Sequence, residues 1–63
     1  MFVYEKVRLY LEAHGLKQKS VAEAAGFQVN TFNAMMMGRR KMTAEDLRRV
    51  CLVLGVSADT FIK

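Results

Sequence analysis

Residues 18–38, QKSVAEAAGFQVNTFNAMMMG, contain the clearest structural pattern of the chain. Two stretches of helix-favouring residues, about 18–25 and 29–37, lie on either side of Gly26, and Gly38 follows the second stretch. Glycine accepts the left-handed backbone conformation in which many helices end. The pattern therefore predicts two short helices joined by a tight turn.

Side-chain size in this stretch fits two helices that cross closely. Ala22 and Ala25 are small where the helices are expected to meet. The residues expected to face the rest of the domain are large and apolar: Val21, Phe27, Phe32 and Met35. This layout is typical of a helix-turn-helix, which places its second helix in the major groove of DNA. We therefore predict a helix-turn-helix over residues 18–38.

Outside this motif the sequence predicts three more helices, at about 2–14, 44–54 and 58–62. Apolar residues in 44–54 follow the i, i+3, i+4, i+7 spacing of a helix face that packs on a core, and Cys51 lies on that face. Thr43 and Ser57 are suitable N-caps for the last two helices. No segment shows the alternation of a strand, so the sequence predicts an all-α fold.

Each predicted helix after the first follows an apolar residue that can pack on the fourth residue of that helix, an arrangement called a hydrophobic staple. The four pairs are Leu16/Val21, Phe27/Phe32, Met42/Leu47 and Val56/Phe61. They tie each connection to the helix that it starts, and connections this short leave no room for a linker. We predict a compact five-helix orthogonal bundle that forms a single domain over residues 1–63.

Composition narrows the function further. Ten Lys/Arg against six Asp/Glu give a net charge of +4, which favours a polyanionic partner. The one cysteine cannot form an internal disulfide, and no Cys/His cluster has metal-ligand spacing, so we expect neither a metal nor a cofactor. No catalytic constellation is present, so we expect no enzyme activity. Without a signal-peptide pattern or an apolar run of about 20 residues, we expect a cytoplasmic protein with no membrane partner.

The motif, together with the runs TAEDL at 43–47 and LGVS at 54–57, resembles the Cro/lambda-repressor-like helix-turn-helix proteins of the xenobiotic-response-element type. The resemblance covers about residues 5–62. It implies a lambda-repressor-like DNA-binding domain that binds a double-stranded operator as a homodimer. It also implies a transcriptional regulator, either a repressor or a Cro-like protein, in a bacterial or phage-infected cell.

The resemblance makes Val29, Asn30 and Ala34 the principal base-reading positions. Asn30 can form paired hydrogen bonds with an adenine edge, and the apolar Val29 and Ala34 can contact thymine methyl groups. Gln28 and Asn33 also face outward and can bind either a base or a phosphate. We therefore expect a preference for half-sites that contain A·T pairs.

The resemblance places Gln18 where the family's glutamine grips a phosphate and supports the second motif helix. Basic residues lie on both sides of the motif, where phosphate contacts supply affinity without sequence information. The expected phosphate-binding residues are Lys17, Gln18, Lys19, Arg39, Arg40 and Lys41. Arg48 and Arg49 receive no role from the sequence.

The chain departs from the family pattern at several positions. Lys17 and Gln28 stand where Ser or Thr often caps the two motif helices. Met37 stands where a polar residue often contacts a phosphate, and Val29 where many members carry a polar base reader. Together with Ala34, these two apolar residues favour a second hypothesis, a protein-interaction module of antitoxin or antirepressor type with weak or lost DNA binding.

Apolar residues off the expected core form a candidate dimer interface. Leu52 and Val53 lie outside the core stripe of the fourth helix, and Ala58 and Ile62 are expected nearby. A dimer would present two reading helices to half-sites about 34 Å apart. Scattered apolar surface is the alternative, since such residues are common on soluble domains.

Overall fold

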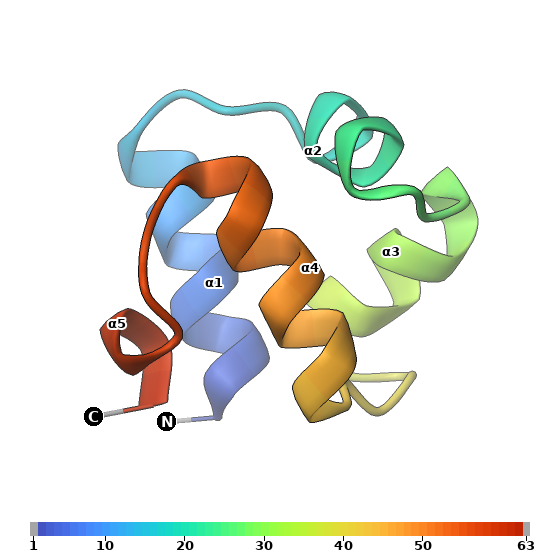
Figure 1. Cartoon of the computed structure of the whole chain (residues 1–63). Helices are drawn as coiled ribbons and strands as arrows, with labels where there is room; N and C mark the ends of the chain where they lie inside the picture. The colour runs from blue at the N-terminus through green and yellow to red at the C-terminus, as the bar shows by residue number, and fades with distance from the viewer. Residues whose placement is uncertain (1, 63) are drawn as a thin grey trace.

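The computed structural model describes residues 2–62, and the first and last residues of the predicted domain lie outside this range. Five helices make up the fold (Figure 1): α1 (Val3–Ala13), α2 (Gln18–Ala25), α3 (Val29–Met36), α4 (Ala44–Leu54) and α5 (Asp59–Ile62). Within residues 2–62 there is no strand. Helix α2 packs against α3 and α4, and α1 packs against α3 and α5. The all-α prediction and the five predicted helices are confirmed.

Four helix ends, in three helices, differ by one residue from the prediction. Phe2 and His14 are the caps of α1, and Met37 is the C-cap of α3, so these residues flank the helices instead of lying inside them. Helix α5 begins at Asp59 and not at residue 58. Ser57 Oγ accepts a hydrogen bond from the Asp59 N–H at 3.1 Å, which is the contact expected of the predicted N-cap.

All five helices contribute buried side chains to the core. The largest of those that are less than 2% exposed are Val7, Leu11, Phe32, Met35, Met36, Val50 and Phe61. Full burial of one such side chain contributes roughly 1.5–3 kcal/mol. Cys51 is also buried, as predicted, and burial raises the pKa of its thiol. The thiol therefore stays protonated near neutral pH and is poorly reactive.

Capping interactions fix the start of α4. Thr43 Oγ1 accepts a hydrogen bond from the Asp46 N–H at 3.1 Å, and Asp46 Oδ2 accepts one from the Thr43 N–H at 3.1 Å. This reciprocal pair satisfies two backbone donors and confirms Thr43 as an N-cap.

The predicted staples vary in burial. The rings of Phe27 and Phe32 lie 5.7 Å apart between centroids, and Met42 and Val56 pack against the core. Leu16 is the exception, because 41% of it is exposed. It lines a groove of about 310 Å³ whose other lining residues are Ser20, Val21, Val53 and Leu54.

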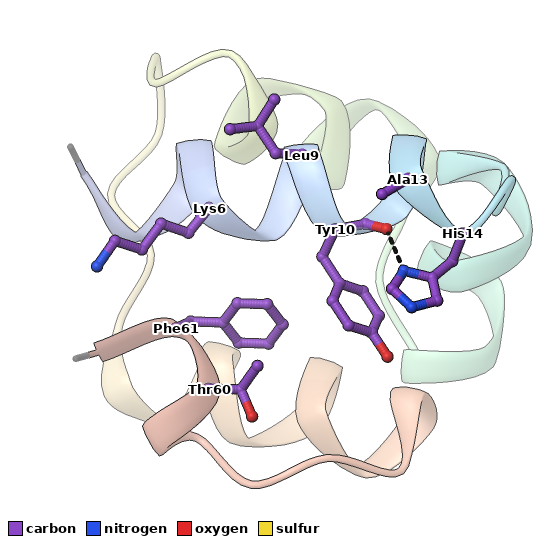
Figure 2. Close-up of a pocket in the computed structure, with 7 residues that line it drawn as sticks. All are labelled: Lys6, Leu9, Tyr10, Ala13, His14, Thr60 and Phe61. Atoms are coloured by element: carbon purple, nitrogen blue, oxygen red, sulfur yellow. Dashed lines mark hydrogen bonds between the residues drawn. The ribbon is translucent and has the colours of Figure 1, made fainter.

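A second hollow, of about 340 Å³, lies between α1 and α5 (Figure 2). Its residues include Tyr10 and His14, whose rings stack with centroids 3.9 Å apart. His14 Nδ1 also lies 2.9 Å from the Tyr10 carbonyl oxygen. These contacts give His14 a structural role at the end of α1. In the described part of the chain, no helix combines the length and apolar character that crossing a membrane requires.

Candidate nucleic-acid interface

Three residues connect α2 to α3. Gly26 ends α2 with φ +83°, a left-handed conformation that costs glycine nothing. The Phe27 N–H then donates to the Ala22 carbonyl at 2.8 Å, which closes the end of the helix. Ala22 and Ala25 are buried on α2, which packs against α3 and α4. The predicted tight turn and the small buried residues beside it are confirmed.

Arg49 of α4 holds this turn. Its Nη2 donates to the Gly26 carbonyl at 3.1 Å, and its guanidinium carbon lies 4.3 Å from the centroid of the Phe27 ring. That distance is within the range of a cation–π interaction. The sequence assigned Arg49 no role, because nothing local relates it to a carbonyl 23 residues earlier.

Arg8 of α1 holds the opposite end of α3. Its Nη1 donates to the Met36 carbonyl at 3.1 Å. The last carbonyls of a helix have no partner within the helix, and a cation there also interacts favourably with the helix dipole. Two arginines from different helices therefore hold the turn before α3 and the end of α3, and sequence reasoning missed both contacts.

Replacing Arg49 by alanine is expected to lower the free energy of unfolding by about 1–2 kcal/mol. The change removes a charge-assisted hydrogen bond and a cation–π contact, both partly exposed. Urea denaturation followed by circular dichroism measures the loss. The control is Arg48→Ala, at an exposed neighbour on the same helix, which should stay within about 0.5 kcal/mol. Equal losses in the two variants would contradict a specific role for Arg49.

Three side chains from separate segments meet beside α3. Asn33 Nδ2 donates to Gln18 Oε1 at 3.2 Å, which links α3 to the first residue of α2. Arg39 Nη2 lies 3.5 Å from Asn33 Oδ1. The structure thus brings together one predicted base-reading residue and two predicted phosphate-binding residues.

The basic segment after α3 is attached to that helix by its backbone. The N–H groups of Arg39 and Arg40 both donate to the Ala34 carbonyl, at 2.9 and 3.2 Å. The side chains of Arg39, Arg40 and Lys41 are exposed, as are those of Lys17 and Lys19 at the start of α2. The cationic side chains on both sides of the motif therefore extend into solvent from an ordered backbone.

The start of α3 is open to solvent. Gln28, Val29 and Asn30 are exposed, as is Asn33 one turn later, and Ala34 is half-buried. Gln28 at the N-cap of α3 and Lys17 at the N-cap of α2 form no side-chain capping bond. The N–H groups of these first turns are therefore available to an anionic partner such as a phosphate.

Comparison with models of protein families gives one finding, a match of residues 5–61 to the model described as a helix-turn-helix domain. The chain belongs to the helix-turn-helix domain family. The match spans nearly the whole sequence and agrees with the resemblance drawn from the motif residues. No curated protein and no solved structure matches the chain.

Membership makes this a DNA-binding domain of a kind that is typically not enzymatic. In a helix-turn-helix the first motif helix crosses the DNA backbone and the second lies in the major groove. These positions correspond to α2 and α3 here (Figure 1). Within residues 2–62, no group of three His, Cys, Asp or Glu side chains is placed to hold a metal ion.

The candidate dimer residues of this helix-turn-helix domain differ in exposure. Leu52 at 73% and Ile62 at 58% are well exposed, and Val53 at 37% lines the groove beside Leu16. Ala58 is half-buried and packs against the core, so it offers less surface to a partner.

Proposed function

We propose that this helix-turn-helix domain binds a double-stranded DNA operator through α3 and regulates transcription as a repressor or Cro-like protein. One observation carries the proposal: the exposed start of α3 bears amide side chains, and groups of exposed cations precede and follow it in the chain. Amides can read base edges, and cations at the flanks can bind phosphates on both sides of the groove.

In this proposal the bases are read by Asn30, with Val29 and Ala34 contacting thymine methyl groups and Gln28 in reach of a base or a phosphate. The phosphates are bound by Lys17, Gln18, Lys19, Arg39, Arg40 and Lys41. The protein binds as a homodimer through Leu52, Val53 and Ile62 with Ala58 at the edge, so that two copies of α3 reach two half-sites.

Selection of bound sequences from a random duplex library tests the proposal. Related half-sites one helical turn apart, about 10–10.5 base pairs, are expected from a dimer. Fluorescence anisotropy with the selected duplex should show affinity that falls steeply between about 50 and 200 mM salt. Binding that ignores salt, or that does not require duplex DNA, would contradict the proposal.

Replacing Asn30 by alanine is expected to reduce discrimination at one base pair by about 1–3 kcal/mol and to leave the salt dependence unchanged. The matched variant is Arg40→Ala. It should weaken binding to all sequences alike and lower the slope of log K against log salt by about 1. Anisotropy titrations with selected and single-mismatch duplexes measure both effects. If Asn30→Ala alters the salt slope but not the discrimination, Asn30 is not a base reader.

The exposure of two apolar residues favours a second candidate function. Val29 is 38% exposed and Met37 is 51% exposed, at opposite ends of α3. Such side chains suit contact with another protein, as in an antitoxin or antirepressor. An empty selection from the duplex library, with a purified protein partner bound through this face, would support this function over operator binding.

A further inference from the structure

Asn33 is exposed on α3, yet both polar atoms of its side chain already have partners. Its amide nitrogen donates to Gln18 Oε1 at 3.2 Å, and its amide oxygen lies 3.5 Å from Arg39 Nη2. An asparagine that reads adenine needs the same two atoms for the paired hydrogen bonds to the base edge. While it keeps both contacts, Asn33 has one N–H and one oxygen lone pair left for a base, and both lie in the amide plane that Gln18 and Arg39 set.

Arg39 determines which way the Asn33 and Gln18 amide groups are oriented. A guanidinium only donates hydrogen bonds, so the oxygen of the Asn33 amide must face Arg39. The nitrogen of that amide then faces Gln18 and requires an acceptor there, which is Gln18 Oε1. The Gln18 amide nitrogen is consequently turned away from Asn33, with both of its N–H groups directed elsewhere.

The positions of the two outer residues suit phosphate binding. Gln18 is the first residue of α2, whose N-terminal N–H groups have no side-chain cap. Arg39 follows α3, and its backbone N–H is fixed to the Ala34 carbonyl at 2.9 Å. Asn33 lies between these residues and restricts the rotation of both side chains.

We propose that Asn33 is a positioning residue and not a base reader: its amide holds Gln18 and Arg39 as an oriented pair of phosphate donors. This inference rests on the proposed function, because it concerns how the domain grips the DNA backbone. In this view, the residues of α3 that read bases are those before Asn33, together with Ala34.

Titration of two labelled duplexes tests this role, one selected by the wild-type domain and one unrelated duplex of the same length. Asn33→Ala is expected to weaken binding to both by the same factor, about 3–10-fold, and to leave the selected sequence unchanged. Asn30→Ala is the control, because it should change the ratio of the two affinities. In a Gln18→Ala background, Asn33→Ala should have a smaller effect than in the wild type, since one of its partners is gone.

Measurements on the free domain check the contact without DNA. The Asn33 side-chain amide resonances should shift in Gln18→Ala, as seen in nitrogen–proton NMR spectra, and thermal unfolding should show that Asn33→Ala remains folded. Unshifted resonances, a changed base preference in Asn33→Ala, or additive effects with Gln18→Ala would each overturn the role of Asn33 while operator binding stands. A wild-type domain that binds no duplex in a salt-dependent way would instead overturn the proposed function and this inference with it.

Discussion

Replacement of Gly38 by alanine is expected to lower the free energy of unfolding by about 2–5 kcal/mol. Gly38 has φ +79°, a conformation that costs other residues about 1–2 kcal/mol. An added Cβ would also lie 2.5 Å from Oη and 2.6 Å from Cζ of Tyr4, so the end of that half-buried side chain has to shift, at a cost of about 1–3 kcal/mol. The Tyr4 ring also stacks on Phe2, with centroids 5.8 Å apart, so a shift of the ring disturbs that contact.

Urea denaturation of Gly38→Ala measures this loss, and Gly15→Ala is its control. Gly15 has a similar φ of +65°, but an added Cβ there meets no atom within 4 Å. Only the conformational cost of about 1–2 kcal/mol is then expected. A domain of this length has a total stability of about 3–9 kcal/mol, so Gly38→Ala approaches complete unfolding whereas Gly15→Ala does not. Equal losses in the two variants would show that contact with Tyr4 is unimportant.

Phe61→Ala is expected to lower the free energy of unfolding by about 3–5 kcal/mol, the usual cost of removing a fully buried aromatic ring. Phe61 is 1% exposed and meets Tyr10 edge to face, with ring centroids 5.5 Å apart (Figure 2). Helix α5 has four residues, too few to form a stable helix without packing. Loss of the ring should therefore release the whole of α5 from α1.

The next residue provides a matched control for Phe61. Ile62 lies in the same helix but is 58% exposed, so Ile62→Ala should change stability by less than about 0.5 kcal/mol in the monomer. Urea denaturation at low protein concentration compares the two variants. Hydrogen exchange should also show faster exchange of the α5 amides in Phe61→Ala. Unchanged exchange in α5 would contradict its attachment through Phe61.

The sequence predicted the helices and their connections because those features depend on neighbours along the chain. Gly26 between two helix-favouring stretches identified the turn, and Thr43, a suitable N-cap before an apolar helix face, identified the start of α4. Apolar spacing placed Val50 and Cys51 in the core. In each case the interacting residues lie within one or two turns, so their relation can be recognised without knowledge of the fold.

The contacts that position α3 were missed, since they join residues far apart in the chain. Arg49 meets Gly26 and Arg8 meets Met36 across 23 and 28 residues. An arginine on a helix surface looks the same in a sequence whether it reaches a carbonyl or points into water. The hydrogen bond between Asn33 and Gln18 has the same origin, because it joins residues 15 positions apart on α3 and α2.

The two arginine contacts, one at the turn before α3 and one at the end of α3, have a consequence for the thermodynamics of association. Arg49 joins the turn that leads into this helix to α4, and Arg8 joins the end of the helix to α1. Because α3 is held in this orientation before binding, it loses little conformational entropy when a complex forms. We expect the domain to dock as a rigid body, with backbone shifts of no more than about 1 Å.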